Sequence, residues 1–389
     1  MSTTVRIALI GAGYAGQSHA FGYRNAQLDD SLNGVELILG TVVDPNQQLA
    51  DYVKGKYCFR QTGSDISQVV ARDDIDIVSL ALPNRMYIDV VPPIMRSGKH
   101  VFCEKPLGLD AAEAQQMVSA AAEAGVVNAV GFSFRRIPAL AALHEYVKAG
   151  RLGDIEWFNA HYFADYAADP RQPRTWRYVM EESGGGAIAD IGAHALDTVR
   201  YVVGDLAEVV STSLTTLITE RPLPAGGIGH SQKASETERG AVTNDDNALV
   251  SLKAESGAIG TVTLSRIATG VPNDLAIEVH GTKGWARFSS ARMDELTLFE
   301  QGVSEAGSDG ARTIVAGPAF PYFASTAAMP GRGVGTGYDE AFMAEIQEFV
   351  GAVLGHGEVS NPFATAIPTM KAIAAAQQSA RSGRPVKID

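Results

Sequence analysis

The sequence predicts an α/β protein with an N-terminal, doubly wound parallel sheet and a C-terminal α/β domain on a large, mostly antiparallel open sheet. Three observations predict this. A short apolar strand runs into a glycine-rich turn and a helix at residues 5–20. Strands then alternate with helices up to residue 132, which indicates crossover connections and parallel strands. From residue 154 long strands joined by short turns dominate, which favours antiparallel pairing.

The first strand, Val5–Ile10, is followed at once by three glycines in the spacing G-x-G-x-x-G. At a strand-to-helix junction this spacing is typical of a Rossmann dinucleotide site. The glycines allow a tight turn, a close approach of backbone N–H groups to a pyrophosphate, and close packing of helix on strand. The expected cofactor-binding residues of this segment are Gly11, Ala12, Gly13, Tyr14, Ala15 and Gly16.

Asp44 ends the second apolar run, Val35–Val43, where the dinucleotide fingerprint has a carboxylate for the ribose hydroxyls. A carboxylate repels a 2′-phosphate, so Asp44 predicts NAD, with NADP less favoured. We interpret the polar segment Asn25–Gly34 as an extra loop that lengthens the distance to the glycines. The alternative is that Asp44 only starts a turn before Pro45.

The alternation then continues to the end of the predicted Rossmann domain, residues 1–132. Ligands of such sheets lie beyond the carboxyl ends of the strands. This rule singles out Pro83, Asn84, Glu104, Lys105 and Pro106. The expected cofactor-binding residues here are Leu82, Pro83, Asn84, Glu104 and Lys105. The predicted elements are a helix to Lys54, strand Ile75–Leu82, helix Met86–Ser97, strand His100–Glu104, a helix from the cap Asp110 to Ala124, and strand Val126–Phe132.

The second domain, residues 133–389, is predicted to bind substrate. Two polar, glycine-rich stretches, Arg221–Asp246 and Gly302–Gly337, are expected to be loops. The predicted strands are Ile155–Phe163, Val209–Ile218, Ala248–Lys253, Ile259–Arg266, Leu275–His280 and Trp285–Ser289, and the predicted helices are Ala139–Ala149, Ile188–Val203, Asp339–Leu354 and Ala366–Ser382.

The composition favours a small-molecule protein. The chain of 389 residues is 46% hydrophobic and carries a formal net charge of -12, which argues against nucleic acid or an anionic membrane as partner. It has no signal-like segment and no apolar run of about 20 residues, so a cytoplasmic location is expected. Cys58 and Cys103 are too few for a disulfide framework, and no metal site is predicted.

Chemistry is expected at two places. Lys105 follows a strand on the cofactor side, where it can hydrogen-bond a reacting oxygen and share its proton. Asp190 and His194 are four residues apart in a predicted helix, so the carboxylate can orient the imidazole and raise its basicity for proton abstraction. The glycines Gly184–Gly186 before them allow backbone to approach a ligand. The alternatives are a solvated lysine and a polar helix face.

An aromatic and basic segment precedes these glycines. Rings stack on the apolar faces of sugars, and guanidinium groups bind hydroxyls or anions. Ordinary loop packing is the alternative for each residue. The segment contains His161, Tyr162, Tyr166, Arg171, Arg174, Trp176 and Arg177.

Together these residues resemble the glucose-fructose oxidoreductase and inositol dehydrogenase family, Gfo/Idh/MocA. The resemblance runs in family order over nearly the whole chain. The motifs that carry it are GAGYAG, LPN at Leu82–Asn84, EKP at Glu104–Pro106, GFSFRRIPA at Gly131–Ala139, GRLGDI at Gly150–Ile155, and GGGAIADIGAHALD at Gly184–Asp197.

The resemblance implies an NAD-dependent dehydrogenase of a sugar, sugar derivative or cyclitol, working as a homodimer or homotetramer. Lys105, Asp190 and His194 would be the catalytic set. One alternative is an NAD-dependent glycosidase that acts on an anionic sugar by oxidising it transiently. A third possibility is a cofactor-sensing regulatory protein. The implied substrate residues are Arg135, Tyr162, Arg174, Trp176, Arg177 and His194.

Overall fold

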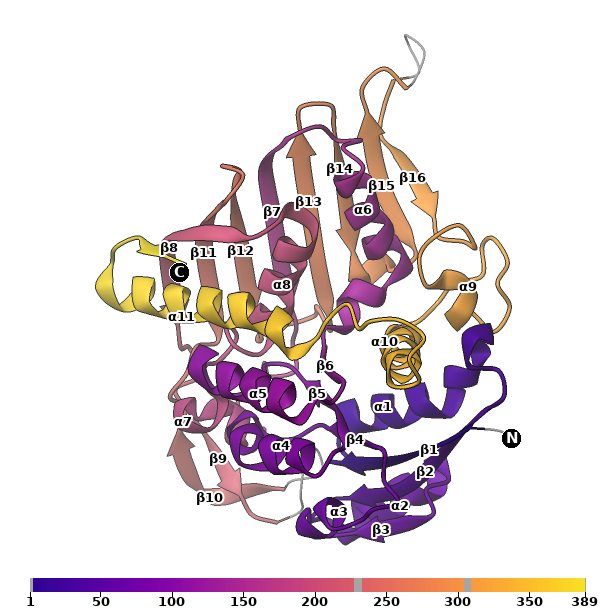
Figure 1. Ribbon diagram of the computed structural model, residues 1–389. Helices are drawn as coiled ribbons and strands as arrows, with labels where there is room; N and C mark the ends of the chain where they lie inside the picture. Colours follow the sequence, from indigo (N-terminus) through magenta and orange to yellow (C-terminus); the bar gives the residue numbers. More distant parts are fainter. Residues whose placement is uncertain (1–2, 227–232, 304–308, 389) are drawn as a thin grey trace.

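The N-terminal sheet has six parallel strands in the order β3-β2-β1-β4-β5-β6 (Figure 1). The computed structural model describes residues 3–226, 233–303 and 309–388. This order is the doubly wound one, so the predicted fold class is confirmed. The strands are β1 (Thr3–Ile10), β2 (Val35–Val43), β3 (Gln61–Gly63), β4 (Ile77–Leu80), β5 (His100–Glu104) and β6 (Asn128–Gly131).

Both faces of this sheet are buried, because alternate residues of a strand point to opposite faces. Ile7 and Leu9 of β1 pack with α1 and α10, whereas Ala8 and Ile10 pack with α4 and α5. The helices of this part of the chain are α1 (Tyr14–Asn25), α2 (Gln47–Tyr57), α3 (Ser67–Val70), α4 (Tyr87–Arg96) and α5 (Ala111–Ala124).

The helix α10 (Tyr338–Val353) packs against α1, although it lies far along the chain (Figure 1). Ile346, Phe349 and Val350 of α10 belong to the same buried cluster as the sheet residues Ile7 and Leu9. A late segment of the chain therefore completes one face of the first sheet. The predicted domain boundary after residue 132 stays a prediction.

In the described residues, the second sheet has the strand order β16-β15-β14-β13-β7-β12-β11-β8-β17. Its pairs are antiparallel except for β7 with β12, as expected for a mostly antiparallel sheet. The strands are β7 (Ile155–Phe163), β8 (Leu206–Thr215), β11 (Asn247–Ala254), β12 (Ile259–Ser265), β13 (Asp274–Gly281), β14 (Gly284–Ser289), β15 (Glu295–Glu300), β16 (Arg312–Val315) and β17 (Val386–Lys387).

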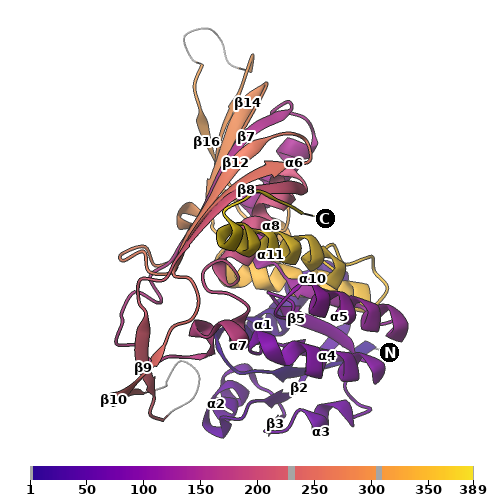
Figure 2. The same ribbon diagram turned by 90° about the vertical axis from the view of Figure 1, so that its left-hand side faces the viewer.

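Three helices, α6 (Pro138–Lys148), α8 (Ile191–Val203) and α11 (Ala366–Ser382), lie on one face of this second sheet (Figure 2). The sheet exposes large apolar side chains that these helices do not cover, among them Trp157, Leu249 and Ile259. The carboxyl end of β5 and the start of α8 meet where the two sheets approach each other, and that junction contains the predicted chemistry.

The prediction that residues 221–246 and 302–337 are loops was wrong in part. The strands β9 (Glu220–Pro224) and β10 (Ala234–Ala241) form a two-stranded sheet, while residues 227–232 lie outside the described part. The second stretch contains β16 and α9 (Phe323–Thr326), with 304–308 outside. Most of β10 is exposed and polar, so it lacks the apolar alternation that indicates a strand. The strand β15 was not predicted.

Candidate active site

The glycine turn after β1 has the shape that a pyrophosphate needs. A Cβ at Gly11 would lie 2.2 Å from the Ala81 carbonyl oxygen, and one at Gly16 would lie 1.9 Å from the Gly11 oxygen. A Cβ at Gly13 would meet nothing within 4 Å. Two glycines therefore pack chain against chain, while Gly13 faces open space at the start of α1. No side chain caps that helix, so its first N–H groups suit an anion.

Asp44 is buried beside this turn. Its Oδ2 accepts a hydrogen bond from Ala12 N at 2.8 Å, and its Oδ1 accepts one from Asn46 N at 2.8 Å. The carboxylate therefore holds the glycine turn against the end of β2. Its expected contact with the ribose hydroxyls stays a prediction.

Two other residues expected to line the cofactor have protein partners. Asn84 Nδ2 donates to the Ser183 carbonyl oxygen at 2.8 Å, which joins the end of β4 to the segment before α8. Glu104 Oε1 lies 3.0 Å from Nε2 of His19, a residue that we had not singled out. Leu82 and Pro83 follow β4 and are half-buried.

Lys105 and Asp190 come together across the junction. Lys105 Nζ donates to Asp190 Oδ1 at 3.1 Å and to the Asp190 carbonyl oxygen at 3.2 Å. Tyr166 donates its hydroxyl to Asp190 Oδ2 at 2.9 Å. Burial acts to raise the pKa of Asp190, but Lys105 and Arg177 outweigh it and hold that pKa below its usual range. The carboxylate is therefore ionised, with a donor on each oxygen.

His194 is buried next to this pair and packs edge-on against Phe134, with ring centroids 4.9 Å apart. Burial and the nearby Lys105 charge lower the pKa of His194 well below its ordinary value, although Asp190 opposes the shift. The ring is therefore neutral at neutral pH. Tyr162, expected to contact substrate, is also buried, with its ring centroid 6.2 Å from that of His194.

The expectation that Asp190 orients the His194 ring was wrong. The helix α8 begins at Ile191, so Asp190 occupies the cap position and turns to Lys105 and Tyr166. Among the described residues, His194 Nδ1 is buried and has no hydrogen-bond partner. The carboxylate acts on His194 through its charge, and its hydrogen bonds position Lys105.

The backbone at the triple glycine was expected to approach a ligand closely, but at Gly186 it lies against another segment of the protein. A Cβ at Gly186 would lie 1.9 Å from the Asp245 carbonyl oxygen. Asp245 also accepts hydrogen bonds from Gly186 N at 2.9 Å and Ile188 N at 2.8 Å. Asn244 Nδ2 donates to the carbonyl oxygens of Arg177 and Gly185 at 2.8 and 3.1 Å. The end of the predicted loop 221–246 thus anchors the segment that leads into α8.

Arg135 was expected to bind substrate, and the structure gives it another role. Its Nε and terminal nitrogen donate to the two oxygens of Asp197 at 2.7 and 2.6 Å. The guanidinium carbon also lies 5.0 Å from the centroid of the Tyr201 ring. Both charged side chains are buried, so Arg135 fixes α8 rather than offering a free cation.

The remaining basic residues of the segment, Arg171, Arg174 and Arg177, do not lie together, and Arg171 is exposed and paired with Asp169. Arg177 is close enough to lower the pKa of Asp190, and its guanidinium carbon lies 4.4 Å from the Trp176 ring centroid. Arg174 donates its backbone N–H to the Pro222 carbonyl oxygen at 2.7 Å, and its side chain packs beside Gly240 of β10. Arg174 therefore contacts the two-stranded sheet.

Three of the functional contacts could not be expected from the sequence. Tyr166 was named only as part of an aromatic segment, and neither His19 nor Asn244 was selected. A polar run, Asn244–Asp246, between two strands was the available signal for the last of these. Such a run does not indicate which distant backbone it will bind.

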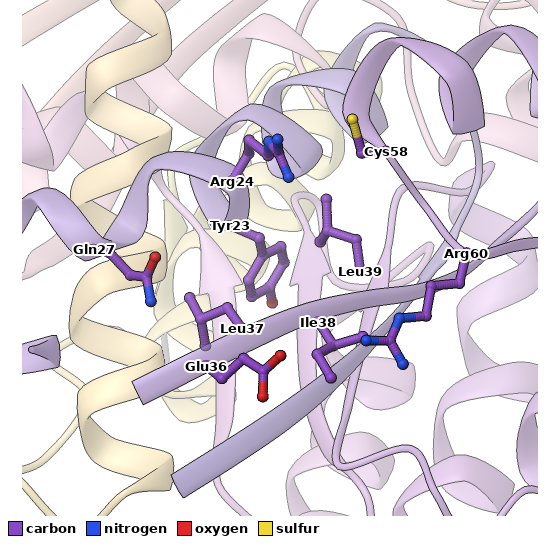
Figure 3. A pocket seen from close by; sticks show the side chains of 9 residues that line it. All are labelled: Tyr23, Arg24, Gln27, Glu36, Leu37, Ile38, Leu39, Cys58 and Arg60. Atoms are coloured by element: carbon purple, nitrogen blue, oxygen red, sulfur yellow. The ribbon is translucent and has the colours of Figure 1, made fainter. Parts of the chain in front are cut away.

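The cavity that Figure 3 shows lies elsewhere, on the first sheet between α1, β2 and the end of α2. Its volume is about 210 Å³, and it contains none of the predicted site residues. Its lining residues are Tyr23, Arg24, Gln27, Glu36, Leu37, Ile38, Leu39, Cys58 and Arg60.

The described residues lack two kinds of feature. No group of three or more His, Cys, Asp or Glu side chains that could hold a metal ion occurs in the ranges given above. None of the described helices is both long and apolar enough to span a bilayer.

Comparisons with known proteins agree with this architecture. Residues 5–132 match the family described as "Oxidoreductase family, NAD-binding Rossmann fold", and residues 140–287 match "GFO/IDH/MocA C-terminal domain". The chain is 32% identical to levoglucosan dehydrogenase of Pseudarthrobacter phenanthrenivorans, over 92% of both chains. It is 26% identical to inositol 2-dehydrogenase of Rhizobium meliloti, over 99% of both.

Solved structures are similar over the whole chain. Levoglucosan dehydrogenase in complex with NADH superposes with a TM-score of 0.91 at 30% identity, covering 100% of both chains. The same enzyme with NADH and L-sorbose gives a TM-score of 0.91 at 30% identity, covering 100% of this chain and 99% of the other. The expected cofactor, NAD, is confirmed by these matches.

Proposed function

Because this chain belongs to the Gfo/Idh/MocA family of NAD-binding oxidoreductases, we propose that it oxidises one secondary hydroxyl of a sugar, sugar derivative or cyclitol. The chain is an NAD-dependent oxidoreductase that acts on CH–OH groups. The observation that carries the proposal is the contact of Lys105 with Asp190 next to a buried, neutral His194, at the carboxyl end of β5. A ligand of such a sheet is expected at that edge.

Each side chain has one task in this proposal. His194 is neutral and takes the proton of the substrate hydroxyl. Lys105 donates a hydrogen bond to the same oxygen and stabilises the negative charge that develops there. Asp190 holds Lys105 in place, and Tyr166 holds Asp190. NAD, when bound, would supply the acceptor for the hydride that leaves the carbinol carbon, and the turn at Gly13 would hold its pyrophosphate.

The substrate side is proposed to be the aromatic and basic segment. Tyr162 lies near His194, Arg177 lowers the pKa of Asp190, and Trp176 packs against Arg177. Such groups suit a polyhydroxylated ring. The relatives' names point to neutral anhydrosugars and inositols. Levoglucosan and the inositols are therefore the first substrates to test.

A substrate panel tests the proposal and separates it from the two alternatives. Levoglucosan, inositols, free sugars and aryl glycosides are incubated with NAD, and both NADH absorbance and released aglycone are measured. A dehydrogenase accumulates NADH in proportion to substrate oxidised. Release of aglycone without accumulation of NADH would show a redox-assisted glycosidase instead of a dehydrogenase. Binding of NADH without turnover of any compound would favour the regulatory protein.

The open face of the second sheet is proposed to join copies into a homodimer or homotetramer. Exposed apolar side chains on this sheet, including Trp157, Leu249 and Ile259, support an interface there. Sedimentation velocity of the native chain and of Trp157→Asp tests it. A monomer at micromolar concentration would contradict the proposal.

A further inference from the structure

His19 is a buried polar side chain that the proposed chemistry does not use. It lies on α1, three residues after Gly16, and is fully buried. Its Nδ1 lies 2.9 Å from Ser79 Oγ, and its Nε2 lies 3.0 Å from Glu104 Oε1. One imidazole therefore connects the helix that begins at the glycine turn with β4 and with the end of β5.

The geometry fixes what one nitrogen does. A carboxylate oxygen accepts, so Nε2 carries a proton and donates to Glu104, while Nδ1 shares a hydrogen bond with the Ser79 hydroxyl. Packing holds the ring edge-on to Phe102, with centroids 5.0 Å apart and planes at 90°. Both polar ends and the faces of the ring are thus constrained.

Glu104 has little freedom to find another partner. A Cβ at Gly131 would lie 2.6 Å from Glu104 Oε1, so the carboxylate lies against the backbone of β6. Two buried groups lie near its charge: burial raises the pKa of Glu345 and of Tyr338, Arg136 opposes the shift at Glu345, and the Glu104 charge raises both pKa values further. In the described residues His19 is the side chain hydrogen-bonded to this carboxylate.

Glu104 is directly followed by Lys105. Successive side chains of a strand point in opposite directions, so a side chain fixed at residue 104 constrains the direction in which residue 105 leaves the strand. Loss of the hydrogen bond from His19 would free the last residue of β5 and hence the backbone of Lys105. Misplacement of a catalytic group by about 1 Å can cost on the order of 10²-fold in rate.

We propose that His19 is a positioning residue that couples the pyrophosphate turn to Lys105. Movement of α1 on binding the cofactor is passed through the imidazole and Glu104 to the end of β5, so the lysine is held correctly when the turn is occupied. The catalytic consequence rests on the proposed function, because it assumes that Lys105 acts on the substrate. The mechanical coupling itself does not.

Three variants of the full-length protein separate the contacts. His19→Gln keeps an amide N–H that can reach Glu104, whereas His19→Asn is too short for Glu104 but can still reach Ser79. Ser18→Ala is the matched control: Ser18 directly precedes His19 on α1, and it donates its hydroxyl to Asp339 Oδ1 at 3.1 Å rather than to Ser79 or Glu104. Thermal unfolding verifies that each variant is folded.

The first measurement does not depend on turnover. Hydrogen–deuterium exchange is followed with and without NADH in peptides covering residues 11–20 and 101–107. In the native chain and in His19→Gln, NADH should slow exchange in both. In His19→Asn it should slow exchange only in 11–20. Equal protection of both segments in His19→Asn would overturn the coupling, whatever the enzyme's substrate is.

The second measurement compares rate with affinity. His19→Asn should lower kcat by roughly 10- to 100-fold, with the NADH dissociation constant changed less than about threefold, and His19→Gln should recover most of the rate. A lower melting temperature with unchanged kcat would show a merely structural residue. Weaker NADH binding with unchanged kcat would show that His19 supports only the cofactor-binding turn and does not position Lys105. If the exchange result holds but no polyol reduces NAD, the proposed function fails while the coupling stands.

Discussion

Lys105 Nζ contacts both the carboxylate and the backbone carbonyl of Asp190, at 3.1 and 3.2 Å. A side chain at the end of the first sheet therefore fixes the side chain and the main chain at the start of α8. Since His194 lies one turn further along that helix, this contact sets the position of both groups at once. The proposed acid–base pair thus depends on how the two sheets meet.

Lys105→Ala and His194→Ala should each lower kcat by roughly 10²-fold or more, the range expected for a lost acid–base group. The loss in the double variant should be smaller than the product of the single losses, because groups that act on one oxygen are not additive. Steady-state kinetics on the substrate found by the panel measures this, with NADH affinity as the control. Near-native turnover in either single variant would assign that residue a structural role.

Asp190→Asn should move the acid limb of kcat/KM to lower pH and lower its plateau. His194 must be neutral to accept a proton, so activity is lost as pH falls through its pKa, which burial and Lys105 hold well below the ordinary value. Asp190 raises that pKa, so removing its charge lowers it further. The pH profile of kcat/KM measures the shift. Asp169→Asn, an exposed carboxylate paired with Arg171, should not move the limb. A shift to higher pH would contradict this assignment.

Short sequence patterns predicted the fold well, because the turns and the strand–helix alternation depend on interactions between residues that are close in the chain. The glycine spacing and the strand–helix alternation are both visible within about 30 residues, and they predicted the sheet and its cofactor. The same locality misplaced Asp190: four-residue spacing puts it beside His194 only if the helix includes both. The helix begins at Ile191, one residue after Asp190, and the Asp190 carboxylate instead accepts a hydrogen bond from Lys105, which is 85 positions away in the chain.

Contacts between distant segments had no such signal. The Arg135–Asp197 pair joins residues 62 positions apart, and either side chain alone is compatible with a substrate site. The strand β10 is mostly polar and exposed, so its pairing with β9 leaves no apolar period to detect. The partner of a buried charged side chain depends on which distant segments the fold brings together, so the sequence around that side chain does not identify it.

Arg135→Met should destabilise the protein without weakening substrate binding. Breaking a buried ion pair typically costs about 3–5 kcal/mol. The loss should lie at the lower end of that range, because an Arg200 nitrogen remains 3.8 Å from Asp197 Oδ1 and the Thr369 hydroxyl 3.4 Å from it. Urea unfolding measures the free energy, and KM should change less than about threefold. The double variant with Asp197→Leu should recover much of the stability. Arg292→Ala, at an exposed arginine paired with Glu295, is the control and should change neither. A raised KM at unchanged stability would return Arg135 to the substrate site.

Asp44 should make NAD the preferred cofactor, and its truncation to alanine should weaken cofactor binding rather than simply change the preference to NADP. A carboxylate facing the ribose accepts from a free diol and repels a 2′-phosphate, so the native kcat/KM should be higher with NAD than with NADP. The Asp44 oxygens also hold Ala12 N and Asn46 N. Asp44→Ala should therefore weaken NADH binding and gain little activity with NADP, because the glycine turn loses its acceptor.

Asp44→Asn separates the two effects, because an amide oxygen can still accept from Ala12 N while the charge is gone. It should bind NADH better than Asp44→Ala and should show the larger gain with NADP of the two. Fluorescence titration with NADH and NADPH measures both affinities. Unchanged NADH affinity in Asp44→Ala would mean that the carboxylate neither holds the turn nor faces the ribose. The specificity for NAD would then have to arise from residues other than Asp44.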